Sequence, residues 1–367
     1  MKSAIIIGGG FAGCAWALQL GRKGFDVTLI ERLGWLGGGC KTFFEGGHPY
    51  TYGPRPLSGF PAGVTDLLEE FTPLRYFRHQ LRTYVARDDA FYTFPPHADD
   101  IKTMPDHDRI TRELAAVPVP PPPPANLEES WLTTVGPTLY GKFVKDYSRK
   151  MWQVESNTAI DGPFHMLTRP RIKTGSRDYV DFELAYPKKN TGWDDFFAGA
   201  AAAPNVTVRL NTTAEAYDIE KPAVLVDGQW LHADFLVSSI SADDLLGQCY
   251  GPLPYMGRDF MNLVLPIEQL LPEHVNFLHY ANDEPYTRIT EYKKLTGHVS
   301  PNTLLGLEFP SRKNRLYPYF TKQALELAQK YFDALPEHII RVGRMGLYKY
   351  LGIHDIVAHA LETVAQL

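Results

Sequence analysis

Apolar and polar positions over the first 30 residues follow the order strand, helix, strand. Ala4 to Ile7 is a short apolar run that predicts a buried strand, and the small and apolar residues over 11–21 predict the helix that follows. Val27 to Ile30 is a second apolar run of strand length. This order predicts a βαβ unit at the start of the chain.

The next part of the chain predicts a hairpin and a helix. Two strand-like stretches within 76–96 flank Arg87-Asp88-Asp89 and predict a β-hairpin. Residues 126–150 predict a helix with Asn126 as its N-cap and acidic residues in its first turn. Between them, the prolines at 120–124 predict a stiff polyproline II spacer, with a ligand for an SH3-type domain as the alternative.

Strand-like runs return in the second half of the chain. Residues 206–210 and 223–241 predict further strands of the domain with which the chain begins. Residues 321–335 predict a helix, residues 338–342 a last strand, and the pattern from about Ile353 a closing helix. The first domain is therefore expected to be discontinuous, with other layers inserted into it.

The glycines after the first strand have the spacing of a dinucleotide-binding turn. Gly8, Gly10 and Gly13 fit the pattern G-x-G-x-x-G. The first glycine permits a tight turn, the second lets a pyrophosphate approach, and the third lets the helix pack close to the strand. Glu31 ends the second strand, 18 residues after Gly13, near the spacing expected for the acid that binds the adenosine ribose. The alternative is a glycine-rich turn in an ordinary α/β protein.

The residues after the second strand favour FAD over NAD(P). Glu31-Arg32 is followed after four residues by Gly37-Gly38-Gly39, and this pattern resembles FAD-binding Rossmann proteins of the glutathione-reductase and amine-oxidase type. The expected cofactor-binding residues here are Gly8, Gly10, Phe11, Ala12, Gly13, Glu31, Arg32, Gly38 and Gly39.

These patterns predict an α/β fold with a discontinuous FAD-binding Rossmann domain, an inserted helical domain and an antiparallel β-sheet domain. Residues 155–190 and 250–320 have strand character and many aromatic residues, which suits the sheet domain. The expected boundaries are 1–75 plus 191–248 plus 321–367 for the Rossmann domain, 97–154 for the helical domain, and 76–96 plus 155–190 plus 249–320 for the sheet and substrate domain.

Composition excludes several classes of protein. A net charge of −5 over 367 residues argues against a general nucleic-acid or membrane-surface role. Cys14, Cys40 and Cys249 have neither a disulfide pattern nor a zinc spacing, and we expect no metal site. No apolar run reaches 18 residues and no leader pattern precedes the first strand, so we expect a cytoplasmic protein.

Three later stretches carry a resemblance to a known family. They are LYGKFVKDYSRKMW at 139–152, EPYTRITEYKKLTG at 284–297 and GRMGLYKYLGIHDIVAHAL at 343–361. Together with the glycine motif, and in this order, they resemble UDP-galactopyranose mutase over nearly the whole chain. The resemblance implies an isomerase that interconverts the pyranose and furanose forms of a nucleotide-linked sugar without net redox change. It also implies FAD in its reduced form, with flavin N5 as the nucleophile at the anomeric carbon.

The resemblance implies a set of cationic and hydroxyl groups for the substrate diphosphate. Arg288, in the Y-T-R stretch, is one expected phosphate ligand, and Arg171 is another, although its alignment is ambiguous with Arg169. Arginine suits this role because its planar fork binds phosphate through two hydrogen bonds. Tyr317 and Tyr350 match tyrosines that bond the diphosphate.

The same resemblance implies an aromatic site for the nucleotide base and a residue beside the flavin. Phe143 and Tyr147 are expected to share one helical face and to clamp uracil, with core packing as the alternative for such a pair. Trp152 is expected to border the sugar. Arg344 is expected to approach the flavin or its pyrophosphate from the last strand.

The chain departs from the family near the expected flavin ring. The family usually has G-x-H-x-x-H, whereas Arg55 and Ser58 stand at the two histidine positions here. We assign Arg55 to substrate binding and Ser58 to cofactor binding. Gly352 also replaces an acidic residue. These departures leave the nucleotide and the sugar open.

Two other functions remain possible at this point. One is a FAD-dependent oxidase or dehydrogenase, and the other is a non-enzymatic, GDI-like binding protein. The resemblance also suggests a homodimer and a mobile lid within 160–190, where Thr174-Gly175-Ser176 supplies small residues.

Overall fold

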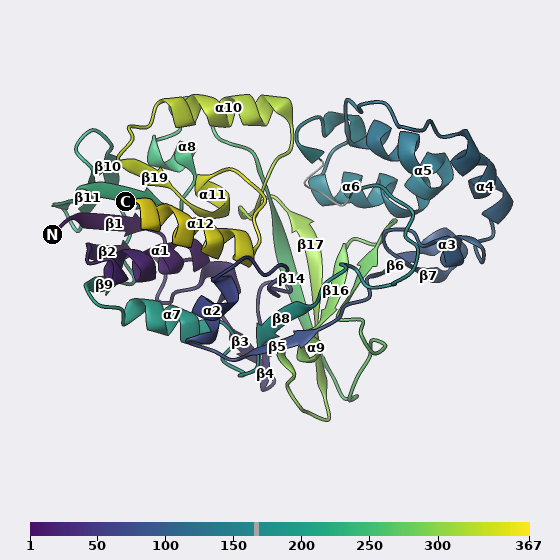
Figure 1. The fold of residues 1–367 in the computed structure, drawn as a ribbon, viewed down its shortest axis with the longest axis horizontal. Coiled ribbons are helices and arrows are strands. Elements are labelled where there is room, and N and C mark those ends of the chain that lie inside the picture. Colours follow the sequence, from purple (N-terminus) through teal and green to yellow (C-terminus); the bar gives the residue numbers. More distant parts are fainter. Residues whose placement is uncertain (165–168) are drawn as a thin grey trace.

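The computed structural model describes residues 1–164 and 169–367 and shows three parts (Figure 1). A Rossmann-type part holds both termini, a helical part lies at the opposite end, and a large sheet stands between them. The Rossmann sheet is parallel, with strand order β19-β13-β1-β2-β9. Its strands are β1 (Ser3–Ile7), β2 (Asp26–Ile30), β9 (Val206–Arg209), β13 (Phe235–Ser238) and β19 (Ile339–Arg341).

Helices cover one face of this parallel sheet and a small sheet within residues 216–232 covers the other, so its central strands are apolar on both sides. The first helix, α1, packs closely against α7 and α12 and is buried along almost its whole length. The helices of this part are α1 (Phe11–Arg22), α2 (Val64–Glu69), α7 (Asp194–Ala201), α8 (Ala242–Leu245), α10 (Lys322–Asp333), α11 (Gly343–Gly346) and α12 (Ile353–Gln366).

The large sheet has the order β18-β14-β17-β16-β15-β6-β7. Neighbouring strands within this sheet are antiparallel, except for β15 and β6, which are parallel. The strands are β6 (Arg82–Val85), β7 (Ala90–Thr93), β14 (Tyr255–Leu265), β15 (Phe277–Tyr280), β16 (Arg288–Glu291), β17 (Thr303–Ser311) and β18 (Tyr317–Pro318). The short helix α9 (Tyr292–Thr296) follows β16.

The helical part consists of α3 (Ala98–Ile101), α4 (His107–Ala116), α5 (Leu127–Phe143) and α6 (Lys145–Trp152). Asn126 caps α5 as predicted, because its side chain accepts the N–H of Glu129 at 3.0 Å. The prediction of one helix over 126–150 is wrong. The chain kinks at Gly136, which has φ +81°, and breaks again at Val144, so two helices meet there.

Residues 223–232 form β11 (Ala223–Val226) and β12 (Gln229–His232), which pair with β10 (Ala216–Asp218) in a small sheet. This small sheet packs on the Rossmann sheet, because Val224 and Val226 are buried together with Ile5 and Ile7. One other expectation needs correction. The described residues of 155–190 add no strand to the large sheet, because their strand β8 (Leu184–Pro187) pairs with β5 (Leu74–Phe77). The remaining short hairpin joins β3 (Phe43–Glu45) and β4 (His48–Tyr50). The hairpin at 76–96 and the elements α10, β19 and α12 are confirmed.

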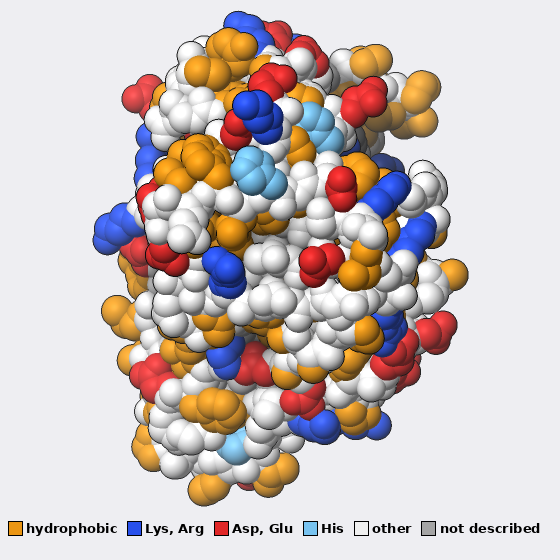
Figure 2. All heavy atoms as spheres, turned by 90° about the vertical axis from the view of Figure 1, so that its left-hand side faces the viewer, with side chains coloured by type: hydrophobic (Ala, Val, Ile, Leu, Met, Phe, Trp, Pro, Cys, Tyr) orange, Lys and Arg blue, Asp and Glu red, His pale blue; other side chains and the backbone are white. Residues whose placement is uncertain are grey.

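The surface agrees with the low net charge. On the face shown in Figure 2, basic and acidic side chains are interspersed. Within the described residues, no helix has the length and apolar character that a bilayer span requires.

Candidate active site

The glycine motif forms a cradle between β1 and α1. Gly8 has φ +95°, and a Cβ on Gly13 would lie 2.0 Å from the carbonyl oxygen of Gly8, so neither position tolerates a side chain well. The space in front of Gly10 is open, and a Cβ there would meet no atom within 4 Å. The free N–H groups at the start of α1 point out of this turn, as a pyrophosphate site requires.

Glu31 completes the cradle at the end of β2. Its carboxylate is buried and accepts the N–H groups of Gly9 at 2.7 Å and Leu33 at 2.8 Å. Gly38 lies close to Gly10 across the turn. The open turn, the acid and the second glycine run fit a dinucleotide such as FAD.

A cavity of about 650 Å³ lies where the three parts of the fold meet. The loop with Arg55 and Ser58 lines it from the Rossmann side, and strands β14 to β18 line it from the large sheet. Helices α5 and α6 close the remaining side with aromatic residues. The cavity therefore combines a polar, cationic region with an apolar, aromatic one.

Arginines dominate the polar region. Arg288 forms a two-pronged ion pair with Glu308, with both N–O distances at 2.7 Å. Arg55, Arg258 and Arg344 contact backbone carbonyl oxygens instead, and no carboxylate among the described residues pairs with them. A site with several unpaired guanidinium groups is built for an anion with several charges.

Tyr317 and Tyr350 stack face to face in this region, with ring centroids 5.5 Å apart. The Arg344 guanidinium lies 5.0 Å from one ring and 4.9 Å from the other. Burial opposes ionisation of Tyr317, but Arg55, Arg258, Arg344 and Arg288 outweigh it and lower the pKa of Tyr317 from 10.0 to about 8. Burial instead raises the pKa of the neighbouring Tyr147 and Tyr350.

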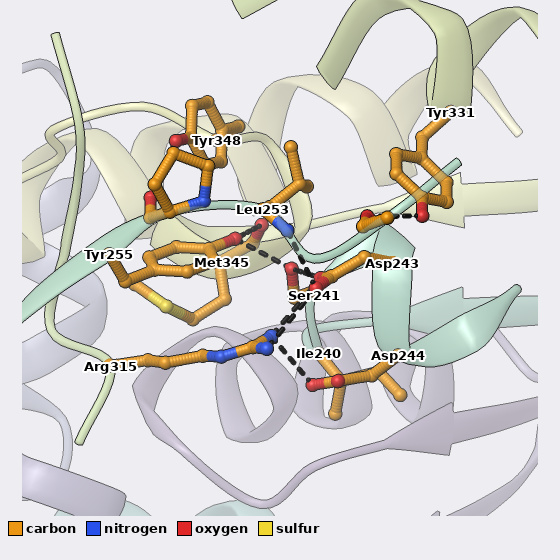
Figure 3. Close-up of polar contacts among 12 residues, drawn as sticks. Ile240, Ser241, Asp243, Asp244, Leu253, Tyr255, Arg315, Tyr331, Met345 and Tyr348 are labelled. Atoms are coloured by element: carbon orange, nitrogen blue, oxygen red, sulfur yellow. Dashed lines mark hydrogen bonds and ion pairs between the residues drawn. The ribbon is translucent and has the colours of Figure 1, made fainter. Parts of the chain in front are cut away.

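A buried ion pair outside the cavity fixes the segment that carries Tyr317 (Figure 3). Asp243 is fully buried at the start of α8. Its carboxylate accepts hydrogen bonds from both terminal nitrogens of Arg315 at 3.1 Å and from the N–H of Leu253 at 2.9 Å. Its neighbour Ser241 also donates to it. Arg315 lies two residues before Tyr317, so this network ties β18 to the Rossmann part.

The aromatic region is centred on Tyr147 and His279. Their rings stack 5.2 Å apart with 21° between the planes, and both line the cavity. The imidazole of His279 makes no hydrogen bond to a described residue. Burial and the nearby Arg288 hold the pKa of His279 well below its ordinary value, so its imidazole is neutral.

Comparison with known proteins decides the family. A family model described as UDP-galactopyranose mutase matches residues 142–350, which include most of the cavity residues. The chain belongs to the UDP-galactopyranose mutase family. A second model, of an NAD(P)-binding Rossmann-like domain, matches residues 6–71.

Relatives of this mutase family match over almost the whole chain. A Klebsiella pneumoniae protein described as a probable UDP-galactopyranose mutase is 24% identical over 99% of this chain and 94% of its own. The dTDP-fucopyranose mutase of Escherichia coli is 23% identical over 99% of this chain and 97% of its own. A solved structure of reduced UDP-galactopyranose mutase has the same fold, with a TM-score of 0.84 and 17% identity, over 100% of this chain and 95% of that chain.

Membership of the mutase family makes the chain an isomerase that acts on a nucleotide sugar. It also supports a flavin cofactor in the Rossmann-like part. The oxidase and the GDI-like alternatives are not supported by these findings.

Most of the residues expected from the family resemblance converge on the cavity. Those that line it are Arg55, Ser58, Phe143, Tyr147, Trp152, Arg288, Tyr317, Arg344 and Tyr350. Arg171 is exposed and outside the cavity lining, whereas its alternative, Arg169, lines it. Lys173 is hydrogen-bonded to Pro96 and Ala98, which draws the chain after Arg171 towards the helical part.

The structure separates the two residues that were expected to clamp the base. Phe143 ends α5, Tyr147 lies in α6, and Val144 between them is not helical, so the two rings do not share one helical face. Phe143 is only 2% exposed and packs against Tyr92 and Phe94. Tyr147 remains open to the cavity, with His279 as its neighbour.

The cofactor role of Arg32 and the lid at 160–190 stay predictions. Arg32 is exposed beside the cradle. The expected lid at 160–190 includes residues 165–168, which lie outside the described residues. Much of its later half is hydrogen-bonded to the rest of the protein, as when Asp178 pairs with Arg78 at 2.7 Å.

Sequence reasoning missed Arg258, Glu308 and His279. Glu308 lies directly opposite Arg288 in the register of β16 and β17, a relation that no local pattern reveals. Arg258 lies in a predicted strand, and the only feature that could have marked it as a site residue is its positive charge within a mainly apolar stretch. His279 lies close to the YTR stretch and carried no separate signal.

Proposed function

We propose that this protein is a flavin-dependent mutase that interconverts the pyranose and furanose forms of a nucleotide-linked hexose. The substrate we expect is UDP-galactose or a related sugar nucleotide. The observation that carries this proposal is one cavity with an arginine-rich region and an aromatic region, whose Arg55 contacts the carbonyl oxygen of Gly39 in the second glycine run of the cradle.

We assign the FAD pyrophosphate to the turn formed by Gly8, Gly10, Gly13 and the start of α1, and the adenosine ribose to Glu31. Reduced flavin, when bound, supplies the nucleophile that takes the sugar from its diphosphate. Arg344 and Ser58 line the cavity, and Gly343 before Arg344 packs against Ala12 of the cradle, so we place both residues beside the cofactor.

The chain's own groups then stabilise the departing diphosphate. Charge develops on the leaving phosphate, and positioned arginines stabilise such charge without reorganisation. Arg258 and Arg288 approach from the sheet, and Tyr317 and Tyr350 line the same cavity. Glu308 holds Arg288 by both prongs and so fixes the direction of its remaining N–H groups.

We assign the nucleotide base to the aromatic region beside Tyr147 and His279. A neutral imidazole and a phenol ring offer a flat apolar surface with hydrogen-bonding edges. Trp152 borders this region, with its ring edge-on to Tyr319 and Phe320. Arg55 faces the sugar side, where this chain departs from the family histidine, so sugar preference is expected to depend on it.

The test is chromatography of the purified protein incubated with UDP-galactofuranose or dTDP-fucofuranose, each with and without dithionite. Conversion of one of them to its pyranose only under reduction supports the proposal and names the substrate. Flavin reduction by an amine or alcohol, without any ring conversion, would contradict it. The homodimer and the cytoplasmic location stay predictions.

A further inference from the structure

A lysine outside the cavity makes an unusual set of contacts. The Lys150 ammonium, on α6, lies 3.0, 2.9, 2.7 and 3.0 Å from the backbone carbonyl oxygens of Tyr280, Asn282, Glu284 and Tyr286. These are alternate residues from the end of β15 through the loop that leads to β16. The loop therefore wraps around the ammonium and directs its carbonyls inward.

Four carbonyls exceed what the ammonium can bond as separate donors. A lysine side chain has three N–H groups, so at least one carbonyl is held by the attraction between charge and dipole. Rings of inward-pointing carbonyls at similar distances are the usual protein ligands of dehydrated potassium ions. The geometry is that of a monovalent-cation site in which the cation is tethered to the chain.

Nearby carboxylates add to the attraction for a cation. One oxygen of Glu284 is buried without a hydrogen-bond partner among the described residues. Burial lowers the pKa of Lys150 to about 8, and Glu284 and Asp283 oppose that fall, so the side chain is a cation at neutral pH. Without a cation, the cage would leave four partly buried carbonyls and a carboxylate to repel one another.

The caged loop lies between residues that line the cavity. His279 precedes it, Arg288 follows it, and Tyr147 is one helical turn before Lys150 on α6. The lysine thus clamps the helical part to the large sheet at the point where Tyr147 stacks on His279.

We infer that the cage of carbonyls around Lys150 is a monovalent-cation site, occupied by the lysine's own ammonium, which positions Tyr147, His279 and Arg288 for the nucleotide. Lys150 is a positioning residue: it lies outside the cavity lining and acts on the substrate site only through the residues it holds. The cation site stands independently of the proposed function, whereas its effect on nucleotide affinity rests on that function.

Lys293 provides a matched comparison in the same fold. Its ammonium contacts the carbonyl oxygens of Glu268, Ser300 and Asn302 at 2.6, 2.6 and 3.0 Å, so its three N–H groups suffice. This lysine holds a surface loop away from the cavity residues. Its truncation to alanine opens a site that water fills, and no dependence on the identity of the cation is expected.

The experiment compares wild type, Lys150→Ala, Lys150→Met and Lys293→Ala in potassium, ammonium or N-methylglucamine chloride at equal ionic strength. Thermal unfolding and UDP affinity are measured for each. For Lys150→Ala we expect a lower melting temperature and about tenfold weaker UDP binding, about 1.4 kcal/mol, both largely restored by potassium or ammonium. The melting temperature and UDP affinity of wild type and Lys293→Ala are expected to be the same in all three salts. The same holds for Lys150→Met, because its methionine side chain fills the space that a free cation would need.

Each outcome decides a separate point. A Lys150→Ala protein whose stability is the same in all three salts overturns the cation site. Wild-type UDP affinity in Lys150→Met overturns the positioning role, and this variant keeps the apolar stem if the alanine protein fails to fold. If potassium restores stability but even wild type binds no UDP, the cation site stands and the proposed function fails.

Discussion

Tyr317 is expected to make nucleotide binding depend on pH. Its pKa of about 8 means that its hydroxyl ionises in the free protein just above neutrality. The resulting phenolate is an anion among the same arginines that we assign to the diphosphate. Binding of the diphosphate therefore requires the neutral phenol, and the complex takes up a proton above pH 8.

The size of the effect follows from linkage. If the bound diphosphate returns the pKa of Tyr317 to its ordinary 10.0, the two pKa values differ by about 2 units, or about 2.7 kcal/mol at high pH. UDP affinity should then fall about tenfold between pH 7 and pH 9, and about 20-fold by pH 9.5. The phosphates of UDP are fully ionised over this range, since their last pKa is about 6.

The assay is calorimetric titration of the protein with UDP from pH 7 to pH 9.5, for wild type, Tyr317→Phe and Tyr350→Phe. Tyr317→Phe keeps the ring stack but has no group to ionise, so its affinity should stay flat above pH 7.5. The pKa of Tyr350 is raised, chiefly by burial, so Tyr350→Phe should keep the slope of wild type. A flat wild-type profile, or an unchanged slope in Tyr317→Phe, would refute the reasoning.

Three further predictions test the cradle, the buried network and the aromatic region. Gly10→Ala should lose flavin, read from the ratio of flavin to protein absorbance, while its melting temperature stays near that of wild type, because the new methyl meets only open space. Gly13→Ala should lose both flavin and about 1–3 kcal/mol of stability, because its methyl strikes a carbonyl; equal behaviour of the two variants would contradict the cradle. Asp243→Asn should cost about 2–3 kcal/mol in denaturant unfolding, because its buried carboxylate holds an arginine by two charge-assisted bonds, and an unchanged midpoint would show that this pair is not stabilising. Phe143→Ala should cost about 3–5 kcal/mol of stability, whereas Tyr147→Ala should chiefly weaken UDP binding; a large loss of UDP affinity at unchanged stability in Phe143→Ala would restore the shared clamp.

Much of the Rossmann part could be predicted because its signals are local. The apolar run of β1, the glycine spacing and the acid at Glu31 lie within 31 residues of one another, and each reflects a constraint on nearby backbone. The N-cap at Asn126 was readable for the same reason, since a cap bonds a residue three positions later.

The break between α5 and α6 shows the limit of local reasoning. The kink at Gly136 stands at a Gly-Pro pair that the sequence already shows. The break at Val144 has no such local signal, and it separates Phe143, which is buried in the core, from Tyr147, which lines the cavity.

The sequence by itself determined the class of fold, the dinucleotide turn and, through its resemblance, the family and most of the cavity residues. Only the tertiary structure decided that Glu308 holds Arg288, that Arg258 joins the arginine group, and that His279 rather than Phe143 lies beside Tyr147. The four carbonyls around Lys150 belong to the same class of fact. These relations join residues far apart in the chain, and they exist only because the strand register and the packing of the three parts bring them together.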